Sequence, residues 1–281
     1  MHFPSLYAYA FIHLLLFIPF PSLEREIKLV KMLSIFRNGV IDPPRELHSP
    51  APMAASVRSK TPDDTLKDFL DSNPKNGYSV QFVDKAALAH ASPQLTRYRS
   101  LFSGVDDVYC IFMGDLKNLC LLNKQYGLTK CGNEALFVIE AYRTLRDRSP
   151  MPAHQVINEL EGSFAFVIYD HKYGTVFAAL GSDKALNLFW GVSSDGSVMI
   201  SDNVGLIKAS CRKSYAPFPP GCLYHSDKGL TSFEHPMHKM KAMPRIDSEG
   251  AMCGSYFAVD AYSKVNSMPR VGSSANWATW G

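Results

Sequence analysis

The 281-residue sequence lacks the short motifs that mark several large enzyme classes. It has no Gly-rich phosphate loop, no GxSxG nucleophile elbow and no HExxH zinc pair. None of its six cysteines forms a CxxC pair, which argues against a zinc site or a thioredoxin-like site. We expect buried thiols in a reducing compartment rather than a disulfide scaffold. The six are Cys110, Cys120, Cys131, Cys211, Cys222 and Cys253.

A strong excess of charge of one sign is also missing. The net charge is only +3, and Lys and Arg are spread along the chain rather than gathered in one stripe. This argues against nucleic acid or an anionic membrane as a partner. His235 and His238 are separated by a Pro in a polar segment that we predict to be a flexible loop, so we expect no metal site and no cofactor.

The first 31 residues differ in character from the rest. The apolar run Tyr7–Phe20 is shorter than the ~20 residues of a membrane helix and has no basic region before it. We therefore expect residues 1–31 to be an upstream extension, and Met32 to be a plausible start of the working protein. On this interpretation we expect the protein to be cytoplasmic. If the extension is real and acts as a signal, the protein is secretory or membrane-associated instead. We expect one domain over residues 32–258 and a disordered tail over 259–281.

The most regular stretch lies in the second half of the chain. Gly162–Tyr169 and Thr175–Leu180 are apolar runs joined by a polar turn, which predicts a buried β-hairpin. Two further strands are predicted at Leu188–Val192 and Val198–Ser201. Because the connections are short, we expect all four strands to be antiparallel.

The other predicted elements fall on both sides of this hairpin. Strands are predicted at Leu33–Phe36, Tyr78–Val83, Ala86–His90, Val108–Met113, Cys222–His225 and Leu230–Phe233. Helices are predicted to begin at Thr61-Pro62 and to span Leu116–Tyr126, Glu134–Leu145, Gln155–Leu160 and Asn203–Ala209. An early and a late set of strands with helices between them predict an α+β fold of two antiparallel sheets packed face to face, with helices outside.

Two short motifs in the middle of the chain carry a resemblance to a known family. They are Tyr126-Gly127-Leu128 and Leu145-Arg146-Asp147-Arg148, and the stretches at Met32-Leu33, 134–142 and 160–166 fit as well. Over about 32–256 the chain resembles the plant aluminium-induced proteins with YGL and LRDR motifs, also called stem-specific proteins. That family is similar to the class-II glutamine amidotransferase domain, as in the N-terminal half of asparagine synthetase. The resemblance implies a four-layer αββα sandwich of the N-terminal-nucleophile hydrolase type.

The resemblance also implies where a catalytic site would lie. Class-II amidotransferases use the thiolate of a first-residue Cys, with its own α-amine as base. The matching residue here is Leu33, which has no nucleophile. The Asn-Gly oxyanion pair of the family corresponds to Met113-Gly114, so only the glycine is kept. The acid that holds the substrate amino group corresponds to Glu134.

The Arg that grips the substrate carboxylate has no clear match, although Arg97 and Arg99 are nearby in the sequence. We therefore expect a non-catalytic protein with a degenerate substrate pocket at Gly114 and Glu134. The family implies a stress-, hormone- or metal-responsive plant protein that acts by binding a small molecule or a protein.

Two alternatives remain open at this point. The protein is an active glutamine amidohydrolase if Ser34 or Cys110 serves as a non-standard nucleophile. It is a self-associating scaffold if the YGL and LRDR motifs form an interface rather than internal packing.

Overall fold

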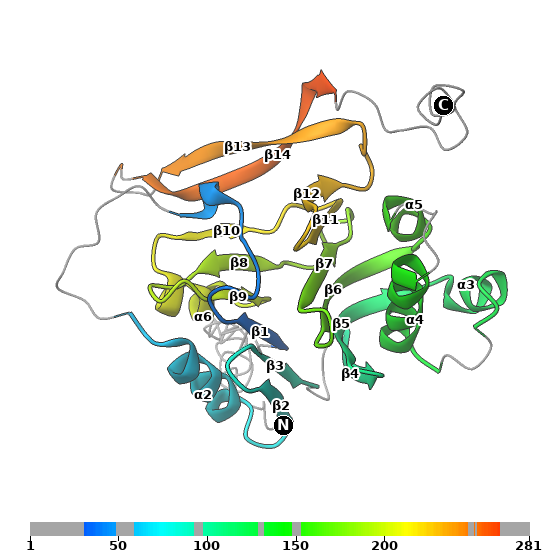
Figure 1. The fold of residues 1–281 in the computed structure, drawn as a ribbon, viewed down its shortest axis with the longest axis horizontal. Coiled ribbons are helices and arrows are strands. Elements are labelled where there is room, and N and C mark those ends of the chain that lie inside the picture. The colour runs from blue at the N-terminus through cyan, green and yellow to red at the C-terminus, as the bar shows by residue number, and fades with distance from the viewer. Residues whose placement is uncertain are drawn as a thin grey trace, which may run out of the picture.

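The computed structural model describes residues 31–48, 59–92, 98–128, 132–147, 153–246, 250 and 252–264. Two six-stranded antiparallel sheets form its centre (Figure 1). Sheet A has the strand order β10–β8–β9–β1–β3–β2. Its strands are β1 (Met32–Phe36), β2 (Gly77–Phe82), β3 (Ala86–Ala91), β8 (Phe189–Val192), β9 (Val198–Ser201) and β10 (Tyr215–Pro217). Sheet B has the order β12–β11–β7–β6–β5–β4. Its strands are β4 (Arg99–Val105), β5 (Val108–Leu116), β6 (Gly162–Asp170), β7 (Thr175–Leu180), β11 (Cys222–His225) and β12 (Gly229–Ser232).

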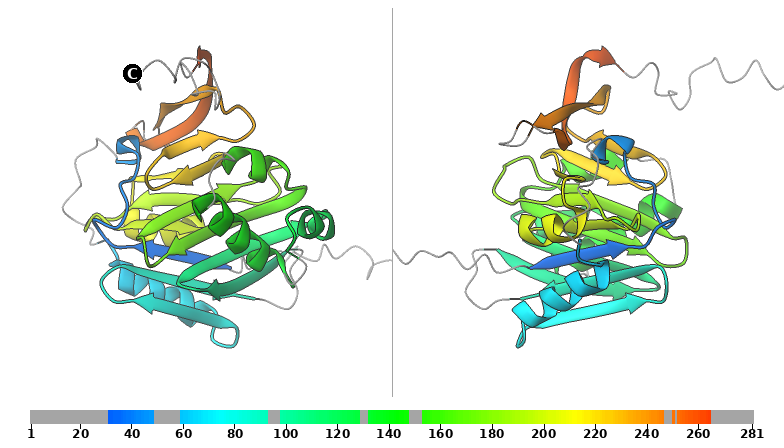
Figure 2. Two further views of the ribbon diagram at one scale, coloured as in Figure 1. Left: turned by 45° about the vertical axis from the view of Figure 1, so that its right-hand side comes forward. Right: turned by 90° about the vertical axis from the view of Figure 1, so that its left-hand side faces the viewer.

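Helices cover the outer face of each sheet, which gives the predicted order of layers, αββα (Figures 1 and 2). The helices α2 (Pro62–Ser72) and α6 (Val204–Cys211) pack on sheet A. On sheet B lie α3 (Leu119–Gln125), α4 (Glu134–Asp147) and α5 (Ala153–Asn158). α2 begins at Thr61-Pro62 as predicted, and the structure adds a capping box there: the Asp64 N–H donates to Thr61 Oγ1 at 3.1 Å, and the Thr61 N–H donates to Asp64 Oδ2 at 3.2 Å. A 3-10 helix, η1 (Arg45–Leu47), follows β1.

Three apolar cores hold these layers together. The inter-sheet core lies between the sheets and includes Met32, Phe36, Ile111, Tyr169 and Trp190. The α2–α6 core lies outside sheet A and includes Leu33, Ile35, Leu66, Phe69 and Ile207. The α4 core lies outside sheet B and includes Cys110, Phe112, Phe137, Phe166 and Ile168. Side chains that alternate along β1 and β5 therefore enter different cores, as expected for strands buried on both faces.

The central hairpin is confirmed, but its predicted continuation is only partly right. β6 pairs with β7, and β8 pairs with β9, each antiparallel. However, β7 lies between β6 and β11 in sheet B, whereas β8 and β9 belong to sheet A. The chain crosses between the sheets after β7, over residues 181–188. All four strands are buried, so the local pattern contained no signal for this crossing.

The predicted helix Leu116–Tyr126 begins too early. Strand β5 continues through Gly114 to Leu116, paired with Phe164, Ser163 and Gly162 of β6 in turn. The helix starts only at Leu119. Leu116 and Leu122 enter the same α4 core, which is why the leucine spacing resembled one helix face.

A separate two-stranded ribbon was not predicted. β13 (His238–Ile246) pairs with β14 (Met252–Lys264) and projects beyond the sandwich at the top of Figures 1 and 2. The segment at His235–His238 therefore leads into a strand rather than continuing as a loop. β14 also passes position 258, where we expected the domain to end, and residues 265–281 lie outside the described residues. Charged residues and Pro244 hid the strand pattern of β13.

Candidate functional site

The side chain of Leu33 is part of the hydrophobic core. It has 0% exposure and belongs to the α2–α6 core with Leu66 and Phe69. Met32 and Phe36, on the other face of β1, enter the inter-sheet core. The residue that we expected at the amidotransferase nucleophile position thus fills space beneath α2 and α6.

The backbone at the start of β1 is bound on both sides. Leu33 pairs with Ala89 of β3 and with Ser201 of β9. Just before it, the Lys31 N–H lies 3.1 Å from both Asp202 carboxylate oxygens, and the Met32 N–H donates to Asp202 Oδ1 at 3.2 Å. In the 281-residue chain these nitrogens are peptide N–H groups, and Asp202 binds both of them.

The Asp202 carboxylate is poorly solvated, and burial raises its pKa to about 6. The hydrogen bonds from Met32 and Lys31 and the charge of Lys31 oppose this rise. Burial in turn lowers the pKa of Lys31, whose Nζ donates to the Tyr98 carbonyl oxygen at 3.4 Å. Asp202 therefore anchors the first residues of β1 at a cost in desolvation.

Gly114 is fixed by the close approach of two strands. It lies in β5 between Arg99 of β4 and Phe164 of β6, with φ +130°. A Cβ atom at this position would lie 1.9 Å from the Ser163 carbonyl oxygen. The glycine is therefore required by backbone packing, whatever role the position has in relatives. Met113, which replaces the expected Asn, points into the inter-sheet core.

Glu134 is the first residue of α4 and is buried, with 6% exposure. The side chain of Asn133 accepts from the Leu136 N–H at 2.9 Å and caps the same helix end. A carboxylate in the first helical turn is favoured by the helix dipole. Leu33 packs on the outer face of sheet A, whereas Glu134 begins a helix on the outer face of sheet B. Arg99 is exposed on β4, and Arg97 lies outside the described residues.

The YGL motif is a helix C-terminal cap. Gly127 has φ +69°, its N–H donates to Lys124 O at 3.3 Å, and the Leu128 N–H donates to Asn123 O at 2.7 Å. These two bonds define a Schellman motif, which normally ends in glycine. The Tyr126 hydroxyl donates to Glu159 Oε2 at 2.7 Å and joins α3 to the end of α5. Leu128 packs against the α4 core.

The LRDR motif joins α4 to the turn of the central hairpin. Arg146 Nη1 donates to Asp170 Oδ2 at 2.7 Å, and the Tyr142 hydroxyl donates to the same oxygen at 3.2 Å. Arg146 also pairs with Asp147 and lies 5.1 Å from the Tyr173 ring. The bond from Arg146 lowers the pKa of Asp147. Arg148 lies outside the described residues.

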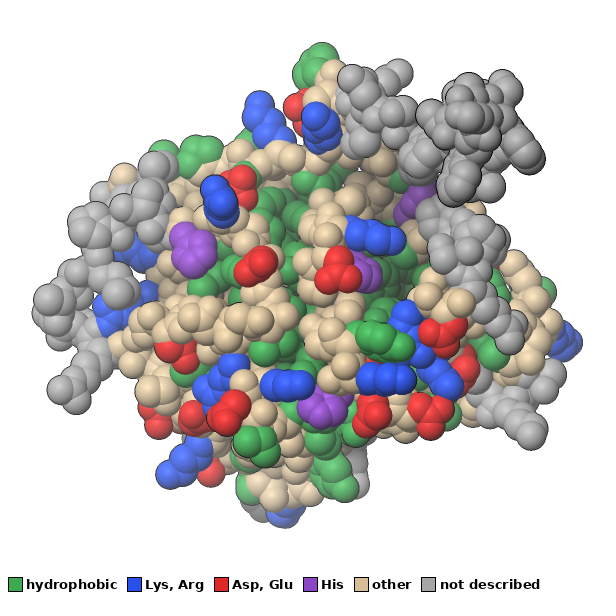
Figure 3. All heavy atoms as spheres, viewed as in Figure 1, with side chains coloured by type: hydrophobic (Ala, Val, Ile, Leu, Met, Phe, Trp, Pro, Cys, Tyr) green, Lys and Arg blue, Asp and Glu red, His purple; other side chains and the backbone are tan. Residues whose placement is uncertain are grey.

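Both motifs are thus engaged in internal contacts. Figure 3 shows Lys and Arg side chains alternating with Asp and Glu side chains over the region of α4, without a patch of one sign. Gly127 after a helical run predicts a helix stop, and the structure confirms it. The contact between Arg146 and Asp170 depends on the tertiary fold and could not be predicted.

Other chemistry is not assembled in the described part of the chain. No group of three or more His, Cys, Asp or Glu residues there is placed to hold a metal ion. Cys110, Cys211 and Cys222 are buried, and burial raises the pKa of each thiol, to about 12 for Cys222. None of the described helices has the length and apolar character that crossing a bilayer requires.

Comparison with known proteins places these features in a family. Residues 33–259 match the family of aluminium induced proteins, and the chain belongs to that family. The stem-specific protein TSJT1 of Nicotiana tabacum is 38% identical over 152 residues, which cover 53% of this chain and 99% of that protein. The resemblance inferred from the YGL and LRDR motifs is therefore confirmed.

The matches to glutamine-dependent enzymes cover a smaller share of the relatives' own length. A probable asparagine synthetase (glutamine-hydrolyzing) of Dictyostelium discoideum is 37% identical over 70 residues, which are 25% of this chain and 12% of the synthetase. Among solved structures, the glutamine phosphoribosylpyrophosphate amidotransferase from B. subtilis is similar, with a TM-score of 0.46 and 12% identity. That match covers 72% of this chain and 49% of the amidotransferase chain.

Proposed function

We propose that this protein is a non-catalytic relative of the class-II glutamine amidotransferases. It acts in plant responses to stress, hormones or metals by binding a ligand or another protein. The degenerate substrate pocket is expected at Gly114 and Glu134. In this proposal the chain has lost the glutamine chemistry of these relatives.

The burial of Leu33 is the observation that carries the proposal. Covalent amide hydrolysis needs a nucleophile with a nearby base. Leu33 supplies neither a thiol nor an α-amine, and its side chain is enclosed by α2 and α6. Deleting a nucleophile from an enzyme lowers its rate by many powers of ten.

The surroundings of Ser34 and Cys110, the other candidate nucleophiles, do not support an active amidohydrolase. Ser34 has 0% exposure and lies inside β1 between β3 and β9. Cys110 has 0% exposure in the α4 core, where burial raises the pKa of its thiol. A nucleophile must be accessible to the substrate, and it must be ionised or activated by a base. Neither buried side chain is accessible.

A labelling experiment tests the proposal. The purified full chain is incubated with a diazoketone analogue of glutamine, and its intact mass is measured, with an asparagine synthetase as positive control. We expect a covalent adduct on the synthetase and an unchanged mass for this protein. An adduct mapped to Ser34 or Cys110 would favour the active amidohydrolase instead.

A further inference from the structure

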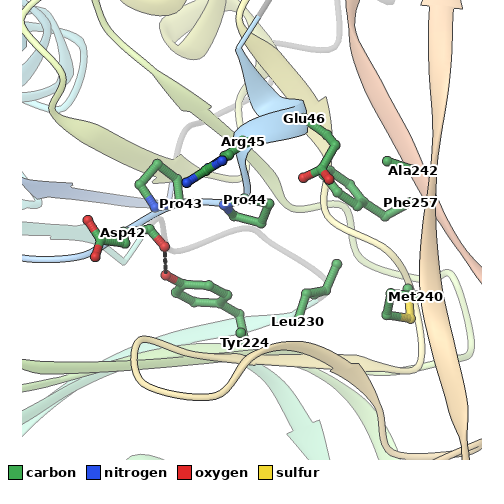
Figure 4. Close-up of a pocket in the computed structure, with 11 residues that line it drawn as sticks. Asp42, Pro43, Pro44, Arg45, Glu46, Tyr224, Leu230, Met240, Ala242 and Phe257 are labelled. Atoms are coloured by element: carbon green, nitrogen blue, oxygen red, sulfur yellow. Dashed lines mark hydrogen bonds between the residues drawn. The ribbon is translucent and has the colours of Figure 1, made fainter. Parts of the chain in front are cut away.

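A cavity of about 350 Å³ lies between η1, the β11–β12 hairpin and the β13–β14 ribbon (Figure 4). This volume falls within the range of about 300–1,000 Å³ that is common for small-molecule sites. Leu33, Gly114 and Glu134 do not line it. The cavity is therefore a different place in the fold from the predicted amidotransferase-like pocket.

The walls of the cavity are fixed by hydrogen bonds at both ends of one loop. The Tyr224 hydroxyl donates to the Asp42 carbonyl oxygen at 2.8 Å, and Ser255 Oγ donates to the Glu46 carbonyl oxygen at 2.8 Å. Trp190 braces the aromatic walls, because its ring centroid lies 5.3 Å from that of Tyr224 and 5.5 Å from that of Phe257. A cavity that is already formed binds ligand without the cost of ordering its walls.

The lining combines an apolar interior with charges at one side. Leu230, Met240 and Phe257 are partly buried and pack against the inter-sheet core, and they form the apolar interior. Arg45 and Glu46 are exposed neighbours on η1 at the rim of the cavity. In Figure 4 the Glu46 carboxylate points into the space beside Phe257, and the Arg45 side chain extends over Pro43. Among the described residues, neither side chain has a hydrogen bond or an ion pair with another residue.

We propose that this cavity binds an α-amino acid with an apolar side chain. Arg45 pairs with the carboxylate, Glu46 pairs with the ammonium group, and the side chain enters the space bordered by Leu230, Met240 and Phe257. One positive and one negative group at the rim, on either side of the opening to an apolar interior, match the charges and the apolar body of such a zwitterion. This binding is independent of Leu33 and of whether the protein is catalytic.

Calorimetric titration of the full chain with L-phenylalanine tests the proposal. N-acetyl-L-phenylalanine lacks the ammonium group, L-phenylalaninamide lacks the carboxylate, and L-glutamine lacks the apolar side chain. We expect L-phenylalanine to bind and each of the three to bind at least about tenfold more weakly, because each loses one of the matched contacts. Binding of the amide or the acetyl derivative as tight as that of L-phenylalanine overturns the proposal.

Substitutions locate the site. Arg45→Gln and Glu46→Gln are each expected to weaken L-phenylalanine binding by about tenfold or more. Lys67→Gln on α2 and Glu161→Gln before β6 remove matched exposed charges elsewhere and are expected to leave binding unchanged. Ala242→Leu, which adds volume to the cavity wall, is expected to abolish binding while the melting temperature stays within a few degrees. No binding by the unsubstituted chain, or equal binding by the Arg45 and Glu46 variants, contradicts the proposal.

Discussion

The Arg146 guanidinium donates a 2.7 Å hydrogen bond to Asp170, a carboxylate with no solvent exposure at the end of β6. This contact fastens the C-terminal turn of α4 to the turn between β6 and β7. It gives the LRDR motif a structural role inside the domain. The Tyr126 contact with Glu159 does the same for the YGL motif.

Removing the charge of Arg146 is expected to destabilise the fold. Arg146→Gln leaves the buried Asp170 carboxylate without its cation, so we expect a loss of about 2–4 kcal/mol in the free energy of unfolding by urea. Arg143→Gln is the matched control on the same helix. Its partners Asp106 and Glu140 are 74% and 29% exposed, and we expect a loss below about 1 kcal/mol. Equal losses would show that Arg146 is only a surface residue.

The same motif tests the scaffold alternative. Arg146→Glu places a second negative charge beside Asp170 and is expected to lower stability further. If the LRDR motif is internal packing, light scattering of the folded variant gives the same molar mass as that of the unsubstituted protein. A change in molar mass without a loss of stability would favour an interface at this motif.

Two glycines with positive φ are expected to respond differently to alanine. At Gly127, φ is +69° and nothing lies within 4 Å of an added Cβ. Gly127→Ala therefore costs only the strain of the left-handed backbone, about 1–2 kcal/mol in the free energy of unfolding. Gly114→Ala adds a collision with the Ser163 carbonyl oxygen. We expect a loss of about 4 kcal/mol or more, or no soluble protein. Urea unfolding and soluble yield measure both, and a mild effect at Gly114 would mean that β5 and β6 separate easily.

The environment of Asp202 predicts a specific pH dependence. Its pKa is raised from 3.8 to about 6 in the folded protein, so between about pH 4 and pH 6 the folded state binds a proton that the unfolded chain has released. The contribution of Asp202 to the free energy of unfolding is therefore largest below pH 4. It falls as the pH rises through this window, by at most about 3 kcal/mol.

Urea unfolding of Asp202→Asn from pH 4 to pH 7 isolates this contribution. Relative to the unsubstituted protein, the variant is expected to gain stability progressively as the pH rises toward 6, because it carries no charge to desolvate. Asp71→Asn, an exposed substitution on α2, serves as control and is expected to show a constant difference. A difference for Asp202→Asn that moves in the opposite direction would mean that the hydrogen bonds from Lys31 and Met32 outweigh burial.

The sequence was informative where a single element carried its own signal. The helix start at Thr61-Pro62, the apolar strands β6 and β7 and the helix at Glu134 all have local patterns, and the structure confirms them. The order of the predicted strands and helices gave the layers, and the family resemblance implied the same αββα arrangement. Local patterns could not show that β7 and β8 lie in different sheets, because both are buried apolar strands.

The candidate site was less predictable for a physical reason. The family resemblance implied that Leu33 stands at the nucleophile position, but only the structure shows that its side chain lies beneath α2 and α6. The contact between Asp202 and the start of β1 joins residues 170 positions apart. The cavity beside Arg45 and Glu46 is built from η1 and four strands, two of which the sequence did not reveal.

The central claim is that the fold no longer supports glutamine hydrolysis, and an assay of glutamate release tests it most directly. The purified full chain and its Leu33→Cys variant are each incubated with glutamine. We predict no glutamate above the buffer background for either, since a thiol at position 33 would be buried in the α2–α6 core without a free α-amine beside it. Glutamate formation by the unsubstituted chain that disappears when Ser34 or Cys110 is replaced by alanine would contradict the claim.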